Sequence, residues 1–235
     1  MTTPTFTSTI TVDLIQHVGS DAMIAAAARV STGRDLDNHS DKANNGLINY
    51  LMKHRHGTPF EQNSITFRVS APIFVFREWH RHRIGWSYNE ISARYTKLEP
   101  KFYVYPHERP LVQAGSSAHP ELVAGSEWQG RKSGVLMASA YEFAWGYYEE
   151  LLEMGVANEV ARTVLPVGIF SEMYVTTNVR ALLSFLSLRT SNEDAAFPSK
   201  PQYEIEVAAK LMEAHVAELF PVTHEAWNRL GRVSP

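Results

Sequence analysis

The spacing of apolar residues alternates along this chain between the period of a helix and the period of a strand, and this mixture limits the folds open to it. Leu47 and Leu51 recur at helical spacing, whereas Ile65 and Phe67 alternate with polar neighbours as in a half-buried strand. Helical patterns outnumber strand patterns, and no internal repeat or low-complexity segment interrupts them. A chain of 235 residues can also bury a substantial core. We therefore expect a single α+β or α/β domain over residues 1–235.

Capping and turn residues set the boundaries of the expected elements. Ser20 and Ser40 are expected to cap helices that stop at Gly33 and Gly57. Pro72 suits the first turn of another helix. In the first part of the chain we expect a strand within 5–15, helices over 21–31 and from 41 to the stop at 57, a strand over 62–70, a helix over 72–83, and a loop from Gly85 that carries SYNE. After a loop insertion at about 105–128, we expect a helix over about 133–154, a short helix through Arg162, and helices over 178–189 and 201–219.

The net charge and the absence of cysteine exclude several classes of function. A formal net charge of −3 argues against general adhesion to nucleic acid or acidic membranes. Without cysteine, the chain cannot form disulfides, use a thiolate in catalysis or ligate a metal through sulfur. No apolar stretch approaches the roughly 20 residues of a transmembrane helix, and the start, MTTPTFTSTITVDL, lacks the pattern of a signal peptide. We therefore expect a cytoplasmic protein.

Basic side chains gather in the run HRHRIGWSYNEISARY, residues 80–95. The guanidinium forks of Arg81 and Arg83 suit phosphate and pyrophosphate groups, and serine hydroxyls and N–H groups at a turn can add further donors. The alternative is a solvated helix end with charges that favour its C-terminus, in which Glu90 and Arg94 form an i,i+4 pair. Because the run follows a strongly apolar helix and leads into short polar side chains, we favour a segment that binds an anionic, planar ligand.

Histidines occur twice in His-x-His pairs, His54 with His56 and His80 with His82. Such pairs can ligate a metal on a strand, where alternate side chains share a face. Both pairs lie near expected helix ends, where alternate side chains point apart. We therefore expect no metal, and a histidine and a threonine that contact an aromatic cofactor fit the segment around Thr58 better.

Three arginines lie at the ends of later helical patterns. Arg162 precedes a helix break, and Arg180 and Arg189 bracket a stripe of apolar residues that we interpret as core. Asn178 is expected to cap a helix. The three arginines repeat the anion-binding chemistry of the basic run.

RHR followed by SYNEISARY resembles the signature of the flavin-dependent thymidylate synthases. The segments AARVS, HGTPFEQ, ARTVLP and NVRALLSFLSLR resemble further motifs of that family in the same order, so the resemblance covers roughly residues 20–210. One departure is the spacer Ile84–Ile91, which has eight residues where the family pattern has seven; the additional residue lies in Ile84–Trp86, and Gly85 makes a local bulge easy. Gln62 and Ser184 also replace residues that are common in relatives.

The resemblance implies a fold and a reaction. The fold would be a single domain with a central mixed or antiparallel sheet flanked by helices. The reaction would be reductive methylation of dUMP to dTMP, with 5,10-methylenetetrahydrofolate as carbon donor, NADPH as hydride source through FAD, and tetrahydrofolate as product. The absence of cysteine agrees with it, because no thiolate can attack the uracil ring. The family also implies a homotetramer with shared active sites.

The resemblance further implies two sets of binding residues. The FAD set is Ser31, His56, Thr58, Glu61, Arg81, His82, Arg83, Asn89, Asn178, Arg180 and Ser184, with the last three from another subunit. The dUMP set is Glu78, Arg81, Glu90, Ser92, Ala93, Arg94, Arg162 and Arg189. Arg189 would be the catalytic residue, because it can polarise a uracil carbonyl and stabilise negative charge on the ring. Ser92 has no neighbouring base, so we interpret it as a binding residue and not as a nucleophile.

Two other classes of function remain as alternatives. A nucleic-acid-binding module would use the basic run against a phosphate backbone, and a metal-dependent hydrolase would use the His-x-His pairs. Neither alternative explains five ordered motifs in one chain.

Overall fold

The computed structural model describes residues 2–33, 39–116 and 121–235. The chain divides into two compact units, and both contain segments that are far apart in sequence. Unit 1 comprises Met1–Ile10, Ser70–Arg77 and Glu90–Glu172, and unit 2 comprises Thr11–Val69, Glu78–Asn89 and Met173–Pro235.

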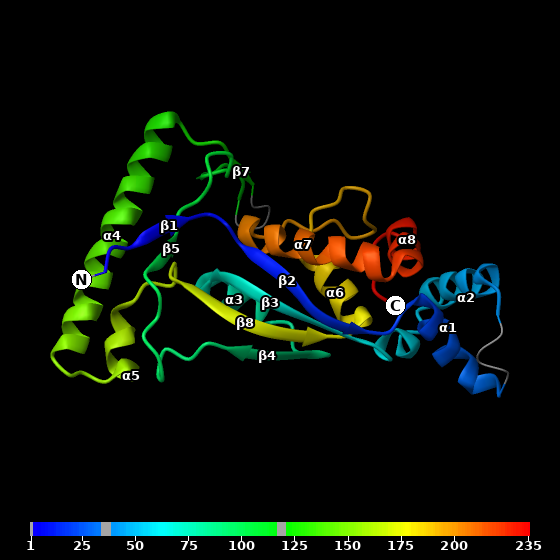
Figure 1. Ribbon diagram of the computed structural model, residues 1–235. Coiled ribbons are helices and arrows are strands. Elements are labelled where there is room, and N and C mark those ends of the chain that lie inside the picture. The colour runs from blue at the N-terminus through cyan, green and yellow to red at the C-terminus, as the bar shows by residue number, and fades with distance from the viewer. Residues whose placement is uncertain (1, 34–38, 117–120) are drawn as a thin grey trace. The chain divides into compact units, whose positions relative to one another are not determined.

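Unit 1 is built on a long helix and two short strand pairs (Figure 1). Strand β1 (Thr5–Thr7) pairs in parallel with β5 (Lys101–Tyr103), and β6 (Val112–Gln113) pairs antiparallel with β7 (Leu122–Val123). The main helices are α4 (Glu127–Glu153) and the short α5 (Asn158–Ala161), which a single 3₁₀ turn (Arg162–Val164) follows. The chain enters α4 through a capping box, in which Ser126 and Gln129 satisfy each other's backbone N–H groups.

The core of unit 1 is aromatic. Tyr141, Trp145 and Tyr148 are spaced by four and three residues on α4, so they form one buried face of that helix. Phe102 packs on this face, with its ring stacked on Tyr141 at 4.9 Å between centroids. This packing, and not helix propensity alone, stabilises a helix of this length.

Unit 2 contains most of a four-stranded sheet and five of the helices. The strand order is β2 (Thr11–Val18), β3 (Ser64–Pro72), β8 (Phe170–Thr177) and β4 (Trp86–Glu90), and the ends of the last three strands reach into unit 1. The helices are α1 (Asp21–Arg29), α2 (Asp41–Lys53), α6 (Val179–Arg189), α7 (Tyr203–Leu219) and α8 (Pro221–Arg229). Helix α7 runs along β2 and packs against α6 and α8, and α1 packs on α2 (Figure 1).

Several sequence predictions are confirmed. The fold is the expected mixture of helices and sheet. Ser20, Ser40 and Asn178 cap α1, α2 and α6, and each accepts a hydrogen bond from the N–H group three residues on. Within the described residues, no helix combines the length and the apolar character that crossing a bilayer requires.

Other predictions were wrong. SYNE does not lie in a loop but in β4, the edge strand beside β8. The helix after Pro72, α3, covers only Ile73–Trp79, because the chain turns where the His82 N–H group bonds the Trp79 carbonyl. Strand β3 is not half-buried: all but two of its residues are buried, so side chains on both of its faces are covered.

Some elements differ in extent or were missed. The single strand expected within residues 5–15 is the two strands β1 and β2. Helix α4 begins six residues earlier than position 133, and the expected loop insertion contains the β6–β7 hairpin, although residues 117–120 of that insertion lie outside the described residues. Strand β8 and helix α8 had no sequence prediction.

Candidate functional site

A cavity of about 990 Å³ in unit 2 brings together the basic run, the start of α6 and the last residues of the chain. It is lined by seven members of the predicted FAD set: Glu61, Arg81, His82, Arg83, Asn178, Arg180 and Ser184. The RHR motif and Asn178 lie more than 90 positions apart in sequence. Asn178, Arg180 and Ser184, expected from another subunit, line this cavity beside the RHR motif of the same chain.

The turn that lines the cavity between Arg83 and β4 depends on Gly85. Its φ of +75° lies in the left-handed region, which glycine adopts at little cost. A Cβ at this position would lie 2.8 Å from the Ala181 Cβ, so the turn packs closely on α6. The Thr177 hydroxyl donates a hydrogen bond of 2.9 Å to the Gly85 carbonyl and fixes the turn. This turn accommodates the spacer that is one residue longer than the family pattern.

Two asparagines satisfy the first N–H groups of α6 at the cavity. The Asn178 carboxamide accepts from the Ala181 N–H group at 2.9 Å, and the Asn63 carboxamide accepts from the Val179 N–H group at 2.8 Å. Unpaired N–H groups at a helix start would otherwise destabilise it. These bonds hold the helix that carries Arg180 and Ser184.

Arg180 is oriented by three neighbours. Its Nη1 donates to Glu61 Oε1 at 2.7 Å, and its Nε donates to the main-chain oxygen of Pro235 at 2.7 Å. Gly57 lies against the guanidinium, since a Cβ there would be 2.4 Å from the Arg180 Cζ. A guanidinium has five N–H donors, so these two bonds leave donors for an anionic ligand.

His82 is held as a neutral acceptor. Arg189 Nε donates to His82 Nε2 at 3.0 Å, so the proton of the neutral imidazole lies on Nδ1. Burial, together with the positive charges of Arg189 and Arg81, lowers the pKa of His82 to about 4. Arg189 also forms an ion pair of 3.1 Å with Glu78. The catalytic candidate is therefore anchored on both sides.

Trp86 and His82, which line the cavity, belong to a cluster of packed rings with Tyr88 and Phe185. The ring of Trp86, which lines the cavity, stacks on Tyr88 with centroids 6.0 Å apart and planes within 7°. The Phe185 ring lies 5.2 Å from Trp86 and 4.8 Å from His82. Planar rings beside guanidinium groups suit a ligand that combines an aromatic ring with phosphates. The volume lies at the upper end of the usual range for ligand sites.

Comparisons with known proteins agree with the motifs. A family model described as thymidylate synthase complementing protein matches residues 13–222. The flavin-dependent thymidylate synthase of Streptomyces avermitilis is 52% identical over 236 residues, which cover 99% of this chain and 96% of the relative. The enzyme of the same name from Tropheryma whipplei strain Twist is 46% identical, with 99% and 96% covered. This chain belongs to the flavin-dependent thymidylate synthase family. It is accordingly a methyltransferase enzyme.

Solved structures support the fold. The UMP/dUMP methylase PolB from Streptomyces cacaoi, bound with 5-Br UMP, is 47% identical to this chain and superposes with a TM-score of 0.93, covering 99% of both chains. The same protein bound with 5-Br dUMP also gives a TM-score of 0.93, at 48% identity. The fold expected for the flavin-dependent thymidylate synthases is thereby confirmed.

The remaining members of the predicted FAD set lie outside the cavity, all in unit 2: Ser31, His56, Thr58 and Asn89. Ser31 donates to the Ala28 carbonyl at the end of α1, and Asn89 lies exposed in β4. The His56 ring packs edge-on against Tyr50, 5.9 Å between centroids.

The predicted dUMP set divides between the two units. Glu78, Arg81 and Arg189 belong to unit 2, and Glu90, Ser92, Ala93, Arg94 and Arg162 belong to unit 1. Within unit 1, Arg94 forms an ion pair of 3.3 Å with Glu159, so it does not behave as a simple i,i+4 partner of Glu90. The Ser92 hydroxyl accepts from the Arg94 N–H group at 3.4 Å.

The sequence interpretation assigned no ligand contact to six residues that line the cavity: Ile84, Gly85, Trp86, Ala181, Ser234 and Pro235. Trp86 could have been found as the tryptophan within the basic run. Nothing in the local sequence distinguishes Ser234 and Pro235, because the fold alone brings them to Arg180. Among the residues that the structure describes, no three histidines or carboxylates are placed to hold a metal ion.

Proposed function

We propose that this protein converts dUMP to dTMP by reductive methylation, with FAD bound in the cavity of unit 2. The carbon donor would be 5,10-methylenetetrahydrofolate, the hydride source NADPH, and the product tetrahydrofolate. The observation that carries the proposal is the cavity itself, which joins three arginines, a neutral histidine and a tryptophan ring. In this proposal residues 1–235 act as one catalytic domain, and the chain works in the cytoplasm as a homotetramer.

The residues of the cavity fit a flavin nucleotide. Arg81, Arg83 and Arg180 supply fixed positive charge for its phosphates, and Trp86 supplies a planar surface. When bound, the flavin would supply hydride transfer, while the protein binds and orients the reactants. No cysteine is present to form a covalent bond with the uracil ring, so the chain's own contribution is positioning and electrostatic stabilisation.

Arg189 is proposed as the residue that acts on the uracil ring. Its guanidinium can donate to a ring carbonyl and stabilise negative charge that develops there. Its ion pair with Glu78 and its bond to His82 hold it in one orientation, which lowers the entropy lost on reaching the transition state. Ser92, Arg94 and Arg162 are proposed to bind the phosphate of dUMP.

The proposal is tested by the visible spectrum of the purified protein, before and after anaerobic addition of NADPH, with and without dUMP. We expect a flavin spectrum that bleaches with NADPH, and faster when dUMP is present. A colourless protein that also fails to take up added FAD would contradict the proposal.

UMP is a second candidate substrate, because the PolB relative is named a UMP/dUMP methylase and aligns with almost the whole chain. Repeating the reaction with UMP and the folate donor, and analysing the product by mass spectrometry, separates the two. Methylated UMP would show that the site accepts a 2′-hydroxyl group, and its absence would restrict the substrate to dUMP.

A further inference from the structure

Residues 231–235 follow α8 and run along α6 to the cavity. The segment begins with two residues in the left-handed region, Gly231 at φ +81° and Arg232 at φ +57°. A positive φ is uncommon for a residue with a Cβ such as Arg232, and it persists only where surrounding contacts stabilise it. At its far end, Ser234 and Pro235 line the cavity.

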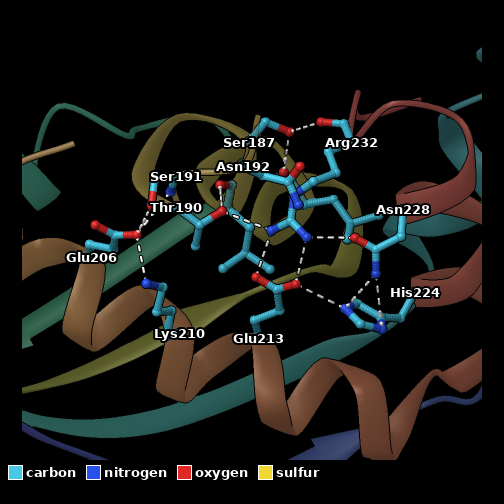
Figure 2. Close-up of polar contacts among 12 residues, drawn as sticks. Ser187, Thr190, Ser191, Asn192, Glu206, Lys210, Glu213, His224, Asn228 and Arg232 are labelled. Atoms are coloured by element: carbon cyan, nitrogen blue, oxygen red, sulfur yellow. Dashed lines mark hydrogen bonds and ion pairs between the residues drawn. The ribbon is translucent and has the colours of Figure 1, made fainter. Parts of the chain in front are cut away.

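Arg232 is locked to α7 by a bidentate ion pair (Figure 2). Its Nη1 and Nη2 donate to the two carboxylate oxygens of Glu213 at 2.8 and 2.6 Å. Burial alone would raise the pKa of Glu213, but hydrogen bonds from His224 and Arg232 lower it to about 2. The Glu213 carboxylate and the Arg232 guanidinium are therefore both charged at neutral pH.

Further contacts fix Arg232 against α6 and α8. Nη2 donates to the Thr190 hydroxyl at 2.8 Å, and the Ser187 hydroxyl donates to the Arg232 carbonyl at 2.5 Å (Figure 2). The guanidinium also lies 4.0 Å from the centroid of the Trp227 ring. With only 8% of the residue exposed, Arg232 is fixed like a core side chain.

The other end of the segment contacts Arg180. The Ser234 hydroxyl donates to the Arg180 carbonyl at 2.9 Å, while Arg180 Nε donates to the main-chain oxygen of Pro235 at 2.7 Å. These two bonds hold both the backbone and the side chain of Arg180. Glu61 holds the guanidinium from the other side at 2.7 Å.

We propose that residues 231–235 form a wall of the flavin site and orient Arg180 toward the phosphates of the flavin nucleotide. Ser234 and Pro235 are the wall, and Arg232 and Glu213 are positioning residues that keep it in place. This inference rests on the proposed function, because it takes the cavity of unit 2 as the place where FAD binds.

The test measures the dissociation constant of FAD for the apoprotein, by quenching of flavin fluorescence, together with the melting temperature. Ser234→Phe places a ring in the cavity at a half-buried position, so we expect FAD affinity to fall about tenfold or more with little change in melting temperature. Arg232→Gln releases the segment and leaves Glu213 with a weaker partner. We expect it to lower both FAD affinity and melting temperature.

Asp21→Asn is the matched control for Arg232→Gln. The Asp21 carboxylate accepts from the N–H groups of Val222 and Thr223, so it holds the opposite end of α8 without contacting residues 231–235. We expect Asp21→Asn to lower the melting temperature and leave FAD affinity unchanged. A purely structural role of Arg232 would make the two variants behave alike.

Arg180→Ala separates failure of this inference from failure of the proposed function. If Arg180→Ala weakens FAD binding while Ser234→Phe and Arg232→Gln bind as the wild type does, the cavity is the flavin site and the proposed wall is overturned. If the wild type takes up FAD but none of these variants changes its affinity, the flavin binds elsewhere and both assignments are overturned. Loss of affinity in all three variants supports the wall.

Discussion

Gly57 lies against the guanidinium of Arg180, and its lack of a side chain is what permits this approach. Its φ is an ordinary −76°, so backbone strain is not the reason for glycine here. The nearest atoms to a Cβ at this position would be Arg180 Cζ and Nε, both at 2.4 Å. These atoms belong to the end of a flexible side chain, which can move without disturbing the fold.

We therefore expect Gly57→Ala to displace Arg180 from Glu61 and Pro235 and to weaken FAD binding severalfold, while the melting temperature changes little. Gly46→Ala is the control, since nothing lies within 4 Å of a Cβ there. Alanine in the interior of α2 should stabilise the protein by about 0.5–1 kcal/mol and leave FAD affinity unchanged. FAD titration and thermal melting check both variants, and equal FAD affinity in Gly57→Ala and the wild type would refute this account of Gly57.

Helix α6 carries predicted site residues at both of its ends, and it is the element that the sequence predicted best. Its cap, its apolar stripe and its last residue all agree with the expected span, because local signals specify each of them. Strand β4 shows the opposite case: its short polar residues are typical of a loop, and the strand forms because β8 lies beside it. The contacts of Ser234 and Pro235 with Arg180 span more than 50 positions, so no local pattern could indicate them.

The end of α6 links Arg189 to His82, which gives a prediction for Arg189→Ala. We expect dTMP formation to be abolished with the fold intact. Burial keeps the pKa of His82 below 6.5, but loss of the Arg189 charge should raise it from about 4 toward that value. Activity assays, circular dichroism and NMR titration of the His82 imidazole measure the three effects. Wild-type turnover would refute the catalytic assignment, and an unchanged His82 titration would refute the electrostatic link.

At the scale of the whole molecule, each unit contains a carboxylate that its hydrogen-bond partners keep charged: Glu149, which is buried in unit 1, and Glu213, which is half-buried in unit 2. In unit 1, Glu149 accepts from Lys97 Nζ at 2.6 Å and from the Thr2 N–H group at 2.8 Å. Burial alone would raise the pKa of Glu149, but these hydrogen bonds lower it to about 2. Glu213 in unit 2 has a pKa lowered to about 2 in the same way. Lowering the pH is therefore expected to destabilise both units in the same way, by protonating a hydrogen-bonded carboxylate.

The direction of the pH dependence follows from these lowered values. A carboxylate with a folded-state pKa of about 2 and an ordinary value of 4.5 stabilises the fold fully above pH 4.5 and loses that contribution as the pH falls toward 2. Each carboxylate contributes on the order of 3 kcal/mol at most, from 1.36 kcal/mol per pKa unit. Urea unfolding between pH 6 and pH 3 should show stability falling below pH 4.5 in the wild type. In Glu149→Gln/Glu213→Gln we expect lower stability at pH 6 and a shallower decline below pH 4.5, because neither position then takes up a proton. Parallel curves for the two proteins would show that other groups control the acid response.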